Sequence, residues 1–256
     1  MIKLKMLFKK EKHVVICIHG FGRRKSLEFD NLMLWSKKDN INFVTFDLFD
    51  ASNPDDSSWM KWVDTADKYI KHYIDNDYRV DVIGYSMGGV IASYLSSKHK
   101  INRLVLLAPA FNYFHIENIT NIILKSSKKI LTSSSDNSGS KLPASFYESF
   151  SSLVKNLKYS INSVNIPTLI IHGDEDEVIP LRSSLYAIDK IPHDNKRLII
   201  LNKGHHRLIQ DKNVNNEVYQ LIKLFLNKDI LPDEPVEYSN MDFNLIVDSY
   251  IKPDDN

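Results

Sequence analysis

The sequence predicts an α/β fold, in which a mostly parallel β-sheet is covered by helices on both faces. Short apolar runs alternate along the chain with longer segments whose apolar residues recur at helical spacing. A strand buried on both faces reads as a nearly continuous apolar run, and its parallel neighbour is reached through a crossover helix. The length of 256 residues suits one such domain, or one domain that carries an insertion.

The first part of the chain supplies most of the expected elements. Residues 13–18 form an apolar run, whereas residues 2–8 alternate between apolar and polar side chains, as in a half-exposed strand. The amphipathic pattern of 59–75 is typical of a helix. Further strands are expected at 42–48, 80–84 and 103–108, and further helices at 27–37 and 87–98.

The alternation breaks between residues 110 and 165, which read as helical or irregular and contain the Ser-rich segment 132–140. We predict that residues 110–165 are a lid inserted over the carboxyl edge of the sheet. The core would then comprise residues 1–109 and 166–227. Its remaining strands are expected at 167–172 and 197–201, and its remaining helices at 181–190 and 213–227.

Residues 228–256 form an acidic tail with eight Asp or Glu residues and two Lys residues. Ser239 could cap a short helix that runs to about Tyr250. The apolar residues of that helix are expected to dock either on the parent surface or on a second subunit. A homo-oligomer formed through the tail is therefore one of two alternatives.

Composition excludes several classes of protein. Lys and Arg number 33 against 32 Asp and Glu, and a net charge of +1 argues against bulk nucleic-acid binding. The single cysteine, Cys17, suits a reducing compartment. No apolar run approaches the roughly 20 residues of a membrane span, and the N-terminus lacks a signal-peptide pattern. We expect a cytoplasmic protein without a nucleic-acid partner or stable membrane insertion.

The strongest motif is Gly84-Tyr85-Ser86-Met87-Gly88, which lies between an expected strand and an expected helix. This G-x-S-x-G pattern is typical of a strained turn that lifts a serine Oγ clear of the sheet, where flanking side chains larger than glycine would clash. The N-terminus of the following helix favours negative charge that develops at the turn. Ser86 is therefore the candidate nucleophile.

With this motif, the chain resembles the α/β-hydrolase family over about residues 13–227. Three further segments carry the resemblance in the expected order. They are His19-Gly20-Phe21-Gly22, the segment HGDEDEVIP at 172–180, and Gly204-His205.

The resemblance implies a role for each matching residue. Ser86 would be the nucleophile, His205 the base that takes its proton, and Asp176 the carboxylate that orients the base. The backbone N–H groups of Phe21 and Met87 would stabilise the oxyanion. All three catalytic side chains and both N–H donors follow from the family pattern.

Neighbouring residues leave two of these assignments open. Asp174 lies two residues before Asp176, and His206 directly follows His205. The spacing to Pro180 favours Asp176, and the position directly after glycine favours His205. The sequence contains neither H-E-x-x-H nor paired cysteines, so we expect no metal and no other cofactor.

Two further groups of residues have both a structural and a functional interpretation. His19 and His172 precede glycine at strand ends, and we expect them to be structural histidines with satisfied hydrogen bonds. Arg23, Arg24 and Lys25 are either a solvated surface cluster or a substrate-binding group that attracts an anion.

Together, these features predict a cofactor-free serine hydrolase that cleaves small-to-medium carboxylic esters through an acyl-Ser86 intermediate. Its partner would be a small-molecule acyl ester. A thioesterase or lysophospholipase is the alternative, in which residues 23–25 would meet a phosphate. A non-enzymatic binding protein on the same scaffold is a further alternative, because fold does not fix function.

Overall fold

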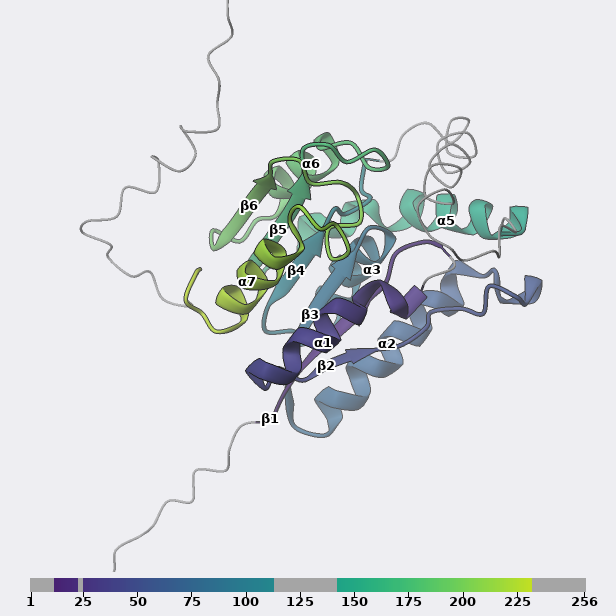
Figure 1. Ribbon diagram of the computed structural model, residues 1–256. Helices are drawn as coiled ribbons and strands as arrows, with labels where there is room; N and C mark the ends of the chain where they lie inside the picture. The colour runs from purple at the N-terminus through teal and green to yellow at the C-terminus, as the bar shows by residue number, and fades with distance from the viewer. Residues whose placement is uncertain (1–11, 23–24, 113–141, 232–256) are drawn as a thin grey trace, which may run out of the picture.

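A computed structural model describes residues 12–22, 25–112 and 142–231 (Figure 1). Several predicted features lie outside these ranges. They are the strand at 2–8, the Ser-rich segment 132–140, the helix that begins at Ser239, and the side chains of Arg23 and Arg24.

Within the described ranges, six parallel strands form one sheet in the order β2-β1-β3-β4-β5-β6. This arrangement confirms the predicted fold class. The strand expected at 42–48 pairs with its neighbour only over three residues. The strands are β1 (Lys12–Ile18), β2 (Phe43–Thr45), β3 (Tyr78–Tyr85), β4 (Leu104–Leu107), β5 (Thr168–Gly173) and β6 (Lys196–Leu201).

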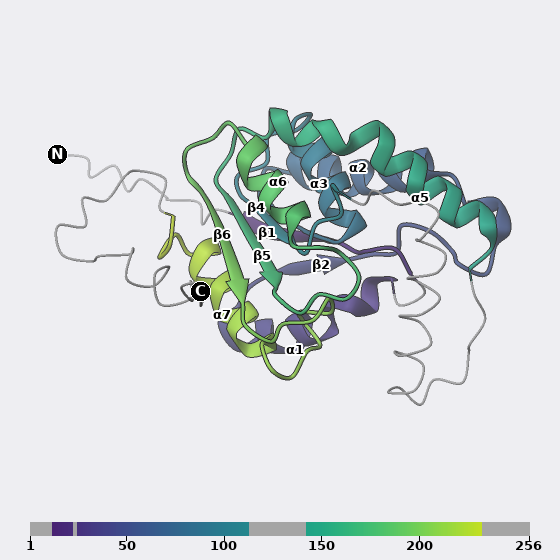
Figure 2. The same cartoon turned by 90° about the horizontal axis from the view of Figure 1, so that it is seen from above.

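Helices cover the two faces of the sheet, with α1 and α7 on one side and α2, α3, α5 and α6 on the other (Figures 1 and 2). No helix in the described part of the chain is long and apolar enough to cross a membrane. The α-helices are α1 (Asp30–Asp39), α2 (Trp59–Asp75), α3 (Met87–Ser96), α5 (Ala144–Leu157), α6 (Arg182–Lys190) and α7 (Asn215–Leu226). The 3-10 helices are η1 (Lys25–Phe29), η2 (Pro54–Asp56) and η3 (Lys158–Ser163).

The sheet separates two apolar cores. In β1, Val14, Ile16 and Ile18 pack in the core beneath α2 and α3, while Val15 and Cys17 pack in the core beneath α1 and α7. Successive strand side chains point to opposite faces, so both faces of a covered sheet need apolar residues. The nearly continuous apolar runs in the sequence have this cause.

The region predicted to be a lid is described in part, as α5 and η3. Phe146 and Phe150 of α5 are buried in the core shared with α2 and α3. Two hydrogen bonds to Ser183 hold the chain at the start of this region. The Ser183 hydroxyl donates to Pro109 O at 2.6 Å and accepts from Asn112 N–H at 3.0 Å. The described part is thus packed against the core, and the lid role stays a prediction.

Parallel strands bring their carboxyl ends to one edge of the sheet, where open α/β sheets bind their ligands. The loops after β1, β3, β5 and β6 all leave from this edge. Phe21, Ser86, Asp176 and the two neighbouring histidines lie on these loops, so the fold gathers the predicted site residues.

Candidate active site

Ser86 occupies the turn between β3 and α3, with φ of 53° and ψ of −114°. A positive φ is costly for any residue except glycine, so the surroundings must hold the turn. The Ser86 N–H donates to Leu107 O at 2.8 Å, and the Ser86 carbonyl accepts from Gly89 N–H at 3.0 Å and from Ala110 N–H at 3.1 Å. The strained elbow that the motif predicts is therefore present.

The glycines of the motif are required by space. A Cβ added to Gly88 would lie 2.0 Å from the carbonyl oxygen of Ile18, and one added to Gly84 would lie 2.6 Å from Gly88 O. Both neighbours are backbone atoms, which cannot make room by a change of side-chain rotamer. The elbow thus packs directly against the end of β1.

The His-Gly loop lies beside Ser86. A Cβ added to Gly20 would lie 3.1 Å from the Cβ of Ser86. Met87 is the first residue of α3, and the first N–H groups of a helix have no intrahelical acceptor. Gly20 and Ser86 thus contact each other at the elbow, and the two predicted oxyanion donors, Phe21 and Met87, directly follow them in the chain.

His19 fixes the base of that loop. Its Nδ1–H donates to Gly20 O at 2.7 Å, and its Nε2 accepts from Leu48 N–H at 2.9 Å. Burial lowers the pKa of His19 to about 4, so the ring is neutral at physiological pH. His19 is the satisfied structural histidine that the sequence predicts.

Asp176 lies in the loop after β5 with its carboxylate buried. Its Oδ1 accepts from the N–H groups of Val178 and Ile179, each at 2.8 Å, and this fixes the direction of Oδ2. Asp174, the other candidate acid, instead accepts from Lys203 N–H at 2.7 Å in an exposed contact. The geometry favours Asp176 over Asp174.

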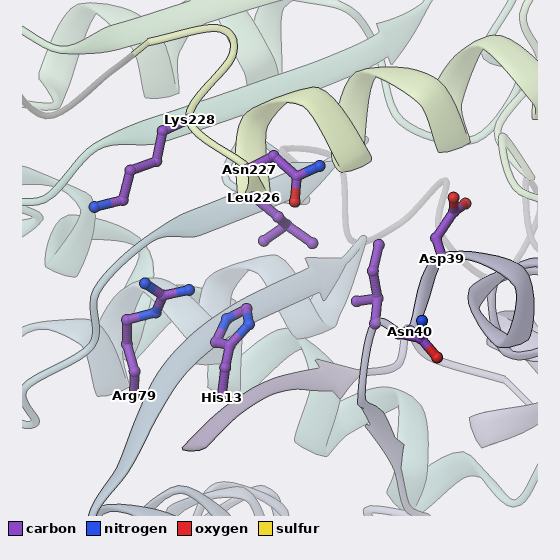
Figure 3. Close-up of a pocket in the computed structure, with 8 residues that line it drawn as sticks. His13, Asp39, Asn40, Arg79, Leu226, Asn227 and Lys228 are labelled. Carbon is purple, nitrogen blue, oxygen red and sulfur yellow. The ribbon is translucent and has the colours of Figure 1, made fainter. Parts of the chain in front are cut away.

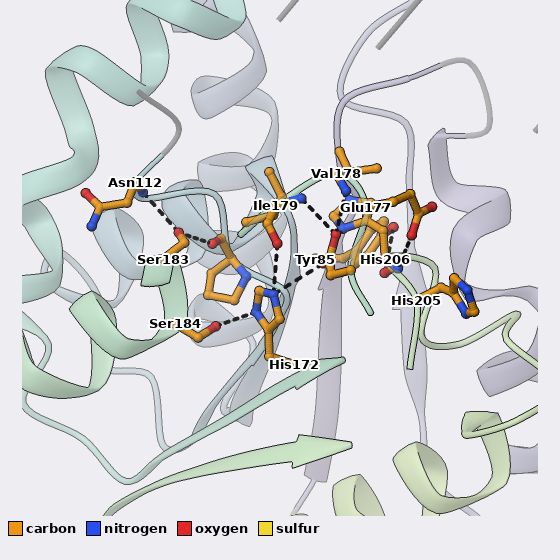
Figure 4. Close-up of polar contacts among 12 residues, drawn as sticks. Tyr85, Asn112, His172, Glu177, Val178, Ile179, Ser183, Ser184, His205 and His206 are labelled. Carbon is orange, nitrogen blue, oxygen red and sulfur yellow. Dashed lines mark hydrogen bonds and ion pairs between the residues drawn. The ribbon is translucent and has the colours of Figure 1, made fainter. Parts of the chain in front are cut away.

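The histidine beside Asp176 is His206, and the expectation that His205 would pair with this carboxylate is wrong (Figure 4). His206 Nδ1 lies 2.8 Å from Asp176 Oδ2 in a buried contact. A carboxylate can only accept, so Nδ1 donates and Nε2 is the ring nitrogen that takes no part in this bond. The His206 ring packs on Tyr85, with centroids 5.2 Å apart.

His205 belongs to a different, half-exposed arrangement, and Figure 4 shows its ring directed away from His206. Both its backbone N–H and its Nδ1–H donate to Asp211 Oδ2, at 2.8 and 3.0 Å. Its Nε2 lies 3.7 Å from Glu175 Oε2. The hydrogen bond to Asp211 raises the pKa of His205.

The charges of Asp176 and His206 support one another. Burial alone would raise the pKa of Asp176, but the charge of His206 and the hydrogen bond from its ring hold that pKa below the usual range. Burial alone would lower the pKa of His206, but Asp176 raises it above the ordinary imidazole value. The ionised carboxylate therefore stabilises the imidazolium that forms when His206 takes a proton.

A contact between two glycines holds the loop after β5, which carries Asp176 (the acid loop), against the loop after β6, which carries His205 and His206 (the histidine loop). A Cβ added to Gly173 would lie 2.0 Å from Gly204 O and 2.8 Å from Gly204 Cα. Gly204 therefore serves close packing, and the histidine that pairs with Asp176 lies two residues after it.

Gly173→Ala tests this contact. The added methyl group meets backbone, so we expect the free energy of unfolding to fall by about 1–3 kcal/mol, the usual cost of overpacking. The urea midpoint of the variant, compared with that of the wild type, measures the effect. An unchanged midpoint would show that the two loops can separate at no cost.

His172 supports the acid loop from below. Its Nε2–H donates to Ile179 O at 3.0 Å and lies 3.4 Å from Asp176 Oδ2, and its Nδ1 accepts from the Ser184 hydroxyl at 2.7 Å. Burial lowers the pKa of His172. Its hydrogen bonds fit the structural role expected for it.

Of the predicted substrate-binding residues, Lys25 falls in the described part. Its Nζ lies 2.7 Å from Asp47 Oδ2, and the same carboxylate accepts from the Ser26 hydroxyl at 2.6 Å. Lys25 is thus engaged by a carboxylate of its own chain. This pairing gives no support to its binding an anionic substrate.

Among all the residues that the structure describes, no group of three or more His, Cys, Asp or Glu side chains is arranged to hold a metal ion. A hollow of about 380 Å³ lies at the amino-terminal edge of the sheet, opposite the elbow (Figure 3). His13 and Arg79, at the starts of β1 and β3, line it together with Leu226 and Lys228. It is separate from the candidate active site.

Solved structures of the same fold include two lipases. A monoacylglycerol lipase of Paleococcus ferrophilus is 13% identical, with a TM-score of 0.65 over 84% of this chain and 95% of that chain. A soluble variant of the Saccharomyces cerevisiae monoglyceride lipase is 20% identical, with a TM-score of 0.67 over 87% and 88%. These likenesses establish the α/β-hydrolase fold.

The model of a family described as "Serine hydrolase (FSH1)" matches residues 22–217, which include Ser86, Asp176 and His206. The chain therefore belongs to this family of serine hydrolases. It is also 30% identical over 206 residues to the uncharacterised protein YfhR of Salmonella typhi. That match covers 75% of this chain and 63% of YfhR, so the chain spans less than two thirds of this relative's length.

Proposed function

We propose that this protein cleaves small-to-medium carboxylic esters through an acyl-Ser86 intermediate, with His206 as the general base and Asp176 as its orienting carboxylate. The observation that carries the proposal is the buried 2.8 Å hydrogen bond between His206 Nδ1 and Asp176 Oδ2, beside the strained elbow of Ser86. Membership of a serine hydrolase family supports the nucleophile.

In the proposed reaction, His206 Nε2 takes the proton of Ser86 Oγ as Oγ attacks the ester carbonyl carbon. The N–H groups of Phe21 and Met87 stabilise the oxyanion, each donor contributing about 3–4 kcal/mol. The C–O bond breaks as His206 returns the proton to the departing alcohol. Water then attacks the acyl-enzyme by the same route and releases the acid.

An aromatic cluster beside the oxyanion loop supports an apolar acyl group. The Phe21 ring stacks on Phe150 at 5.0 Å and meets Tyr147 edge-on at 5.2 Å, with Trp62 and Phe49 behind it. Phe21 and Tyr147 are the partly buried members of this cluster, whereas Phe49, Trp62 and Phe150 are buried in the core. Apolar side chains beside the oxyanion loop suit hydrocarbon better than a charged acid portion.

The test of the proposed function is a panel of p-nitrophenyl esters of increasing acyl length, assayed with the wild type and with Ser86→Ala. A fluorophosphonate that labels Ser86, located by mass spectrometry, tests the nucleophile without assuming a substrate. No turnover and no labelling would contradict the proposal.

The pH dependence should follow from the state of His206, which acts as a base only when neutral. Its pKa is raised above the ordinary value of 6.5, so kcat/KM should fall as the pH drops through an acid limb centred above 6.5. Asp176 remains ionised across that range, because its pKa is lowered. A pH profile in constant ionic strength measures the limb, and a midpoint below 6.5 would contradict the assignment of His206.

A further inference from the structure

The backbone of His206 is bonded at both its N–H and its carbonyl, by side chains from the loop after β5 and from the end of β3 (Figure 4). Its N–H donates to Glu177 Oε2 at 3.2 Å, and its carbonyl accepts from the Tyr85 hydroxyl at 3.3 Å. The neighbouring Asp176 holds its ring at the same time. Three side chains thus fix one residue at its amide, its carbonyl and its imidazole.

Tyr85 lies between the two halves of the candidate site. It is the residue before Ser86, its ring packs on that of His206, and a Cβ added to Gly20 would lie 3.1 Å from its Cδ1. Burial, with the carboxylates of Glu28 and Asp176, raises the pKa of Tyr85 well above its ordinary value. The hydroxyl therefore keeps the proton that it donates.

Glu177 follows Asp176 directly, so the acid loop contacts His206 at two points. A ring held only at Nδ1 can still pivot about that bond as its own backbone shifts. A second bond, to the backbone N–H, removes that freedom and fixes the direction of Nε2. Misplacement of a catalytic group by about 1 Å can cost about 100-fold in rate.

We propose that Tyr85 and Glu177 form a backbone clamp that positions His206 for proton transfer with Ser86. The inference rests on the proposed function of His206 as the base. Neither clamp residue touches the reacting atoms, so both are positioning residues.

Glu177 acts on His206 both through its charge and through its hydrogen bond, and several other charged groups lie around His206. Asp176 and Glu177 face it from the acid loop, and Glu28 faces it from η1. His172, from β5, and Arg207, whose Nε lies 3.5 Å from Glu28 Oε2, belong to the same surroundings. Removing the charge of Glu177 should lower the pKa of His206, whereas removing its hydrogen bond should misalign the ring.

The experiment uses the full chain and the variants Glu177→Gln, Glu177→Ala and Tyr85→Phe. Glu175→Gln is the matched control, because Glu175 contacts His205. The readouts are the pH profile of kcat/KM with a p-nitrophenyl ester, separate kcat and KM values, the second-order rate of fluorophosphonate labelling, and the NMR titration of the His206 ring.

We expect Glu177→Gln to move the acid limb to lower pH with a small loss of plateau rate. Glu177→Ala should move the limb likewise and also lower kcat by about 10- to 100-fold, with little change in KM. Tyr85→Phe should lower kcat by about tenfold and leave the limb nearly in place. The control should match the wild type in both respects.

The clamp is overturned if the variants keep the wild-type limb, kcat and labelling rate and only melt at a lower temperature. Should one variant fail to fold, the other clamp residue supplies the same comparison. Failure of the proposed function is distinguishable, since it means no turnover and no labelling in the wild type. The ring titration of wild type and Glu177→Gln then still tests the contact, and identical titrations would overturn it.

Discussion

Ser86→Ala should lower kcat for ester hydrolysis by about 10⁴- to 10⁶-fold, the range seen when a serine nucleophile is removed. The variant has no oxygen to form the acyl-enzyme. Alanine keeps the Cβ, so the backbone strain at φ of 53° is unchanged and the hydrogen bonds of the elbow remain. We therefore expect the melting temperature to stay close to that of the wild type.

Initial rates on the ester panel measure this effect, and circular dichroism checks the fold. Ser93→Ala is the matched control, because Ser93 is a buried serine within α3, two turns after Ser86, with its hydroxyl bonded to Gly89 O at 2.9 Å. The control should keep its turnover. If Ser86→Ala kept its turnover, the assignment of the nucleophile would be lost.

The second large effect separates the two adjacent histidines. His206→Ala should lower kcat by at least about 10⁴-fold, because nothing else in the proposed mechanism can take the proton of Ser86. His205→Ala should change kcat by no more than a few fold. The His205 ring is half-exposed, and the backbone N–H that donates to Asp211 survives the substitution.

The pair is informative because the two variants remove the same side chain one residue apart. Rates for both are compared on one ester, and the acid limb of His205→Ala is compared with that of the wild type. Loss of activity in His205→Ala alone would restore His205 as the base. Loss in both would indicate that the loop, and not one ring, is what activity requires.

The fold was largely predictable because a covered parallel sheet leaves a strong signature. Runs such as Val14 to Ile18 must be apolar at every position, since alternate side chains enter two different cores. Helical spacing in 59–75 gave α2 its correct bounds. Element ends were less predictable, because hydrogen-bond partners decide them: the strand expected at 42–48 stops pairing at Thr45.

The site was predictable where a steric requirement fixes the residue type in the sequence. Ser86 needs glycine at 84 and 88 for space, and Asp176 stands in a recognisable loop. The sequence names both His205 and His206 and favours His205 because it directly follows glycine, but that glycine marks the packing against Gly173, which is compatible with either ring turning inward.

The choice between the two rings depends on contacts that lie outside the glycine–histidine motif. Asp211 accepts hydrogen bonds from the backbone N–H and the ring of His205. Asp176 accepts from the ring of His206, and Glu177 accepts from its backbone N–H. No motif marks Asp211, and its role appears only once the loop is folded. The same holds for Asp47, which engages Lys25.

The restraint on the chain just after β4 has a consequence for how the protein could diversify. The Ala110 N–H donates to the Ser86 carbonyl, and Pro109 and Asn112 are both bonded to Ser183. The chain that leaves β4 is therefore anchored by residues 109–112, so changes in the sequence beyond residue 112 need not disturb the Ser86 elbow.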